Sequence, residues 1–207
     1  MDMKSKDNLR HYFVSSEHDI SDFFEFEHQQ LGEKFVFTSC NDVFSKNEID
    51  YGSQVLINTI CKDPSLYQGK ILDICCGYGT IGIILSRFLD ATFDMCDINS
   101  LAVKLARLNI EKNNAHVDKL FVSDMWQNVE GKYNHILSNP PIKTGKKTLL
   151  DFLNGINDHL ESKGSVVIVI KKNLGADSTR KYLIDIFGNC EVLQRDKGYY
   201  ILKSTKD

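Results

Sequence analysis

Short apolar runs alternate with segments of helical periodicity from Lys70 to the end of the chain, and this alternation limits the folds that the chain can adopt. The run at 165–170, SVVIVI, is almost continuously apolar and β-branched, which is typical of a strand covered by helices on both faces. Strand–helix alternation over such a length favours a parallel sheet between two layers of helices. We therefore predict a doubly wound α/β fold.

Seven strands and the helices between them can be placed along this region. The strands are expected at 70–75, 91–96, 119–122, 133–138, 164–170, 189–194 and 198–203. The clearest helices are expected at 80–89, 100–113, 146–160 and 176–187. Asp196-Lys197-Gly198 joins the last two strands and is a hairpin signal, so this mostly parallel, Rossmann-like sheet should have an antiparallel last strand.

The first 50 residues are the least regular part of the sequence. We expect a short strand at 34–38 and then a helix at 51–61. The 207 residues are enough for one domain with a sizeable core. We expect residues 1–33 to form an irregular N-terminal extension and residues 34–207 to form that domain.

Cysteine usage and hydropathy bear on the compartment. The six cysteines form no CxxC pair, and several lie in predicted strands, so we expect reduced thiols in a cytoplasmic protein and no metal site. No stretch approaches the ~20 apolar residues of a membrane span, and the N-terminus lacks the apolar core of a signal peptide. We expect no membrane association.

Charge is distributed unevenly, although the net charge is only −3. Residues 1–50 carry eleven acidic and five basic side chains, whereas residues 131–207 carry thirteen basic and eight acidic ones. The C-terminal part could therefore face an anionic partner. Ordinary asymmetry of a protein surface would give the same pattern.

A glycine-rich turn follows the first predicted strand of this region and opens a helix. Gly77, Gly79 and Gly82 spell GxGxxG, and Asp97 follows Gly77 by 20 residues, as in the dinucleotide-binding fingerprint. Glycine lets the backbone turn sharply and lets a ligand approach it closely. The motif is shared by several nucleotide-binding folds, and a tight turn without a ligand would also produce it.

Carboxylates lie at the ends of three successive predicted strands. Asp73 comes just before the glycines, where it would repel a pyrophosphate but would suit the amino group and sulfonium of S-adenosylmethionine. Asp97 can accept from both ribose hydroxyls, and Asp124 from the adenine amine, with Met125 or Trp126 covering the ring. Each acid alone could be a helix N-cap. Together they mark the strand ends where ligands bind in open α/β sheets.

Asn139, Pro140 and Pro141 end the fourth predicted strand. The prolines have no N–H and restrain the backbone, which leaves carbonyl acceptors, and Asn139 adds a side-chain carbonyl. Such acceptors can hold both hydrogens of a planar amine and turn its lone pair toward a methyl donor. We predict that these residues are catalytic, with a rigid turn as the structural alternative.

In this order, the motifs resemble those of class I S-adenosylmethionine-dependent methyltransferases. The resemblance covers about 34–205 and is strongest to the branch of ribosomal RNA small subunit methyltransferase C and its short single-domain relatives, which methylate guanine N2. The matching pieces are Val43-Phe44-Ser45, Ile49–Ser53, Asp73–Gly79, Asp97-Ile98-Asn99, Asn109, Asn139–Ile142 and Gly198–Lys203.

The resemblance implies roles for individual residues. It implies a cofactor site made by Asp73, Cys75, Gly77, Gly79, Asp97, Ile98, Asp124, Met125 and Asn139. It also implies that the segment 44–52 closes over cofactor and substrate. We expect substrate contacts from Phe44, Ser45, Ile142, Lys143 and Lys146.

The sequence departs from the family pattern at three positions. Cys75 replaces the first glycine of the loop, and Asp42 replaces a glycine that precedes Val43 in relatives. Ile142 lies where many relatives have an aromatic residue that stacks on the target base. We therefore expect the stacking to come from elsewhere, with Phe44 as the candidate.

Several functions fit these motifs. The leading hypothesis is methylation of a guanine amine in ribosomal RNA, with phosphate contacts from Lys143, Lys146, Lys147 and the Lys171-Lys172 pair. An adenine amine or a protein glutamine amide would suit the same clamp. A nucleotide-dependent oxidoreductase and a binding module without activity are further alternatives.

Overall fold

A computed structural model describes residues 23–43, 45, 47–141 and 146–207, with the side chain of Lys146 left out. The strands are β1 (Phe23–Gln30), β2 (Glu33–Cys40), β3 (Gly69–Ile74), β4 (Ala91–Asp97), β5 (Val117–Val122), β6 (Tyr133–Ser138), β7 (Leu160–Lys171), β8 (Glu191–Asp196) and β9 (Tyr199–Thr205). The helices are α2 (Tyr51–Ile60), α3 (Thr80–Leu85), α4 (Ser100–Asn113), α5 (Lys146–His159) and α6 (Ala176–Phe187), with 3-10 turns at Pro64–Leu66 and Lys172–Leu174.

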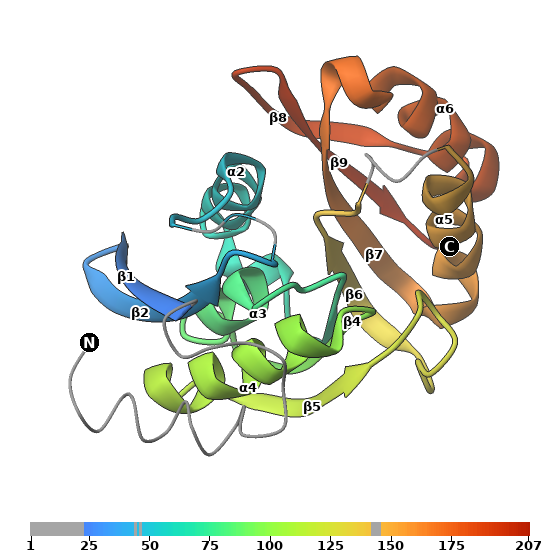
Figure 1. Ribbon diagram of the computed structural model, residues 1–207. Coiled ribbons are helices and arrows are strands. Elements are labelled where there is room, and N and C mark those ends of the chain that lie inside the picture. Colours follow the sequence, from blue (N-terminus) through green and yellow to red (C-terminus); the bar gives the residue numbers. More distant parts are fainter. Residues whose placement is uncertain (1–22, 44, 46, 142–145) are drawn as a thin grey trace.

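The main sheet has seven strands in the order β5-β4-β3-β6-β7-β9-β8. Strands β3 to β7 pair in parallel, and β9 runs antiparallel between β7 and β8. This confirms the predicted doubly wound α/β sheet with its antiparallel last strand. Figure 1 shows α2, α3 and α4 on one side of the sheet and α5 and α6 on the other.

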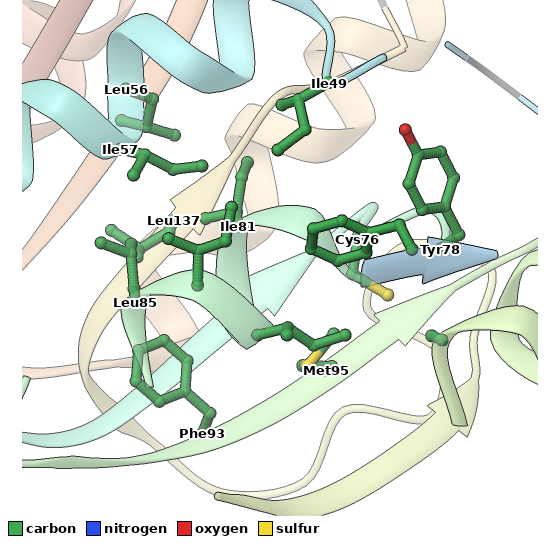
Figure 2. Packing of buried hydrophobic residues seen from close by; sticks show 14 of the residues in the cluster. Ile49, Leu56, Ile57, Cys76, Tyr78, Ile81, Leu85, Phe93, Met95 and Leu137 are labelled. Atoms are coloured by element: carbon green, nitrogen blue, oxygen red, sulfur yellow. The ribbon is translucent and has the colours of Figure 1, made fainter. Parts of the chain in front are cut away.

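Alternate residues of a strand belong to two different hydrophobic clusters, because successive side chains of a strand point to opposite faces of the sheet. In β7, Val167 and Val169 join the cluster under α2, α3 and α4, whereas Val166 and Ile168 join the cluster under α5 and α6. Figure 2 shows part of the first cluster, where Ile57 of α2 and Ile81 of α3 lie over the strands. Burial on both faces explains why SVVIVI carries no polar alternation.

Most predicted element bounds lie within about two residues of those in the structure, and β7 begins four residues earlier than predicted. Two further differences are larger in kind. Helix α3 ends at Leu85 rather than at 89, because turns occupy residues 86–89. Residues 23–30, which we expected to be irregular, form strand β1 and pair with β2 along its whole length. Alternation of aromatic and acidic residues in FFEFE suits a strand with one covered face.

Two asparagines of α4 pair with the free edge of β2. The side chain of Asn109 accepts from the Thr38 N–H at 2.7 Å and donates to the carbonyls of Thr38 and Tyr78, each at 3.0 Å. One helical turn later, Asn113 makes the same pair of bonds to the backbone of Val36, at 2.9 and 2.8 Å. The β1–β2 hairpin is thereby fastened to α4 through backbone groups.

Replacing Asn109 with alanine should lower the free energy of unfolding by about 2–4 kcal/mol, because buried backbone groups would lose their partners. Asn109 is fully buried, whereas Asn113 is only partly buried. Asn113→Ala, the matched control, should cost about 1 kcal/mol, since water can reach the backbone there. Chemical denaturation of both variants checks this, and equal losses would contradict it.

Candidate active site

A cavity of about 600 Å³ opens at the carboxyl ends of β3, β4 and β6, within the size range of small-molecule sites. The residues that follow these three strands line it, and so do residues from the segment before α2 and from the end of β7. The cavity thus lies where the sequence predicted a ligand site.

The turn after β3 is tied to β4 by Asp97. One carboxylate oxygen of Asp97 accepts from the Gly77 N–H at 2.8 Å, and the other accepts from the Asn99 N–H at 2.9 Å. Burial raises the pKa of Asp97, and the backbone N–H donors oppose that shift. Each oxygen keeps a lone pair after these bonds, so Asp97 can still accept from a ligand.

Three residues of this turn, Cys75, Gly77 and Gly79, have positive φ angles. Gly77 has φ +58°, and a Cβ built there would meet no atom within 4 Å, so its missing side chain leaves open space beside the cavity. Cys75, at the position of the family's glycine, has φ +62°. A side chain in this left-handed region costs about 1–2 kcal/mol, which explains why glycine is usual there.

Asp73 lies beneath the turn and does not line the cavity. It is fully buried, and its Oδ2 accepts from the Gly82 N–H at 2.9 Å. Within the described part of the chain, its Oδ1 has no hydrogen-bond partner. Burial raises the pKa of Asp73 to about 7. The second oxygen is therefore a buried acceptor without a partner among the described residues, placed beneath the turn and not at the cavity surface.

Asn139 is held by the first turn of α2. Its Nδ2 donates to Oδ2 of Asp50 at 2.8 Å and to Oγ of Ser53 at 2.9 Å. Asp50 also caps α2 by accepting from the Ser53 N–H at 3.1 Å. A carboxylate only accepts, so the amide must present its NH₂ to Asp50. Oδ1 is then left as an acceptor beside Pro140 and Pro141, which line the same cavity.

The segment before α2 is fastened to the glycine turn by Tyr78. Its hydroxyl donates to the carbonyl of Ser45 at 2.8 Å, with the carbonyl of Glu48 at 3.3 Å. The ring packs edge-on against Phe26 of β1 and Phe37 of β2. Val43 and Ser45 line the cavity.

The turn after β5 places Met125, rather than Trp126, at the cavity. Oγ of Ser123 donates to the carbonyl of Met125 at 2.8 Å, and both residues line the cavity. Trp126 instead donates from Nε1 to the Phe152 carbonyl at 2.9 Å and stacks on His159 of α5. Asp124 is exposed and is not among the lining residues, so the structure does not bring it to the site.

The structure brings together most of the predicted site residues. The cavity is lined by Ser45, Cys75, Gly77, Asp97, Ile98, Met125, Asn139, Pro140 and Pro141. Asp73, Gly79 and Asp124 do not line it. Gly79, with φ +97°, instead begins α3 and packs near Met95. Phe44, Ile142, Lys143 and the side chain of Lys146 lie outside the described residues.

Sequence reasoning placed Asp50, Ser53 and Tyr199 in matching segments but gave none of them an individual role, and all three line the cavity. Asp50 and Ser53 have the spacing of an N-cap and its N3 partner before an apolar run, which is visible in the sequence. Nothing in the sequence shows that the same carboxylate contacts Asn139, 89 residues away.

The described residues contain neither a metal-binding cluster nor a membrane-spanning helix. Over 23–43, 45, 47–141 and 146–207, no three His, Cys, Asp or Glu side chains are grouped so that they could hold a metal ion. No helix in the described ranges has both the length and the apolar character needed to cross a membrane. All six cysteines are free thiols.

Comparison with known proteins gives one family. Residues 34–203 match the family model described as methyltransferase small domain. A Bacillus subtilis (strain 168) protein, described as uncharacterized protein YbxB, is 42% identical over 175 residues, which are 83% of this chain and 86% of the relative. Ribosomal RNA small subunit methyltransferase C of Psychromonas ingrahamii is 32% identical over 77% of this chain and 45% of its own length. The chain thus spans about half the length of these ribosomal RNA enzymes.

Solved structures share the fold. A Thermus thermophilus 16S rRNA N2 G1207 methyltransferase, solved with AdoMet and guanosine, aligns with a TM-score of 0.81 at 22% identity, over 89% of this chain and 51% of that chain. A methyltransferase from Pyrococcus furiosus aligns with a TM-score of 0.66 at 20% identity, over 80% of this chain and 86% of that chain. The cavity lies within the residues matched by the family model, and the chain therefore belongs to the methyltransferase small domain family, within the class I S-adenosylmethionine-dependent methyltransferases.

Proposed function

We propose that this protein methylates the exocyclic N2 amine of a guanine in ribosomal RNA, in the cytoplasm. The observation that carries the proposal is the orientation of Asn139, whose amide NH₂ is engaged by Asp50 and Ser53 so that its carbonyl oxygen is left to accept. The names of the relatives support the target, because several are ribosomal RNA small subunit methyltransferases C. The solved enzyme with guanosine supports it further.

The cavity suits the family's cofactor. Gly77 offers open space, and Asp97 has free lone pairs for ribose hydroxyls. Met125 lines the cavity beside Ser123 and provides an apolar surface for a purine. When bound, S-adenosylmethionine supplies an electrophilic methyl group on a sulfonium.

The chain's own contribution is to grip and aim the amine. An exocyclic amine is a weak nucleophile because its lone pair is delocalised into the ring. Oδ1 of Asn139 and the carbonyl of Pro140 can accept its two hydrogens, which draws the nitrogen toward tetrahedral geometry. The clamp acts by positioning and electrostatics and needs no strong base.

The competing hypotheses are now fewer. The family match decides against a nucleotide-dependent oxidoreductase. An adenine amine or a protein glutamine amide would still suit the clamp. Nucleoside mass spectrometry of RNA from cells with and without the gene tests the target, and loss of N2-methylguanosine is expected. Tritiated methyl transfer to release factors but not to ribosomal subunits would point to the amide instead, and transfer to neither would favour a module without activity.

Asn139→Ala should lower the turnover number by on the order of 10²-fold or more, because the amine loses an oriented acceptor. Cofactor affinity should change little. Single-turnover methyl transfer and calorimetric binding of S-adenosylhomocysteine separate the two quantities. Unchanged turnover would remove Asn139 from the mechanism.

Asp97→Ala should weaken cofactor binding by ~1–3 kcal/mol, since the ribose hydroxyls lose a charged acceptor. Isothermal titration with S-adenosylhomocysteine measures the loss. The control is Asp118→Ala, at an exposed position of β5. Equal affinity in the two variants would argue against the role given to Asp97.

The pKa of Asp73, about 7, predicts a pH dependence of stability. Between about pH 4 and pH 7 the folded protein holds this proton and the unfolded chain does not, so this group's contribution to stability falls as the pH rises. The slope is at most about 1.4 kcal/mol per pH unit. Urea denaturation should show that the free energy of unfolding of the wild type falls relative to that of Asp73→Asn as the pH rises from about 4 to about 7. Two free-energy profiles that run parallel across this pH range would contradict the raised pKa of Asp73.

A further inference from the structure

Two aromatic rings among the described residues line the active-site cavity, and they differ in accessibility. Tyr78 is only 4% exposed, and its hydroxyl is already bonded to the carbonyl of Ser45. Tyr199, the first residue of β9, is half-buried. Tyr199 is therefore the lining ring with surface left for a substrate.

Tyr199 lies beside the asparagine clamp. A Cβ built on Gly52 would come within 2.8 Å of Cε1 of Tyr199 and within 2.9 Å of Oδ2 of Asp50. That carboxylate oxygen is the one that holds Nδ2 of Asn139. The glycine thus lets the Tyr199 ring lie close to the carboxylate that orients Asn139, and Tyr199 and Asn139 line the same cavity.

Two lysines lie over the rings of this region. Nζ of Lys171 is 5.5 Å from the centroid of the Tyr199 ring, and Nζ of Lys197 is 4.7 Å from that of Tyr51. The two rings are themselves 5.8 Å apart. We call Tyr51, Lys171, Lys197 and Tyr199 the tyrosine–lysine rim. Cation–π attraction keeps its two ammonium groups close to the cavity mouth.

A second hollow, of about 420 Å³, continues from the rim. It shares Lys171 and Asn173 with the main cavity and adds Lys172, Asp177 and Gly198. The Lys172 N–H donates to the Gly198 carbonyl at 2.7 Å, which joins the turn after β7 to the β8–β9 hairpin. Lysine side chains outnumber the single carboxylate of this hollow, so it favours an anion.

Building on the proposed function, we propose that the tyrosine–lysine rim and the adjoining hollow bind the single-stranded or flipped-out RNA next to the target base. Tyr199 packs against a base, while Lys171, Lys172 and Lys197 contact phosphates. An aromatic ring interleaved with cations is how proteins grip unpaired nucleic acid. An amide in a protein has no phosphate for these lysines.

The test is the affinity for a single-stranded guanine-containing RNA, measured by fluorescence anisotropy with S-adenosylhomocysteine present. Lys171→Gln and Lys197→Gln should each weaken binding several-fold and lower the slope of log affinity against log salt by about 0.7. Tyr199→Leu should weaken binding at least about fivefold. No methyl transfer occurs in this assay, so the rim is tested separately from the reaction.

The β8–β9 hairpin offers matched controls on its other face. Tyr200 follows Tyr199 but packs against the opposite hydrophobic cluster, and Cζ of Arg195 lies 5.0 Å from its ring centroid. Arg195→Gln and Tyr200→Leu should bind RNA like the wild type. Losses as large as those of the rim variants would overturn the proposal. The proposal would also be overturned if the affinity of the rim variants for S-adenosylhomocysteine fell as much as their affinity for RNA. If the rim variants lose RNA binding while the wild type methylates no RNA, the rim stands and the proposed reaction fails.

Discussion

Two carboxylates, one fully and one partly buried, hold the turn that follows β3, and the site depends on them. Asp73 of β3 accepts from the N–H of Gly82 in α3, which joins the elements on either side of the turn, and Asp97 of β4 accepts from the N–H of Gly77, which ties the turn itself to β4. Through Tyr78, this same turn also fixes the segment before α2. Hydrogen bonds from backbone N–H groups to acidic side chains at the carboxyl edge of the sheet therefore fix the segments that line the cavity.

The clamp is assembled from parts far apart in the sequence. Asn139 comes from the end of β6, and its orientation comes from the first turn of α2. Asp50 serves both as the N-cap of that helix and as the partner of the amide. Helix formation at α2 and the direction of the Asn139 side-chain carbonyl are therefore coupled through one carboxylate.

Much of the fold was predictable from local pattern, since the alternation from Lys70 onward reflects burial on both faces of the sheet. Strand β1 was missed because it is defined by its antiparallel pairing with β2, and the segment FFEFE alone does not reveal that pairing. Of the site, the residues at strand ends were predictable because parallel strands end at one edge. Asp124 is not among the lining residues, since the turn after β5 directs Met125 to the cavity, and its predicted contact with adenine stays a prediction. Long-range partners such as Asp50 require the folded coordinates.

The asparagine pairs of α4 have a consequence for assembly. A two-stranded hairpin has two open edges, and an open edge is a template on which another chain can add a strand. At Val36 and Thr38, carboxamides of Asn113 and Asn109 occupy the backbone groups that a third strand would use. Helix α4 thus occupies this edge of β2, where another chain would otherwise have backbone groups on which to add a strand.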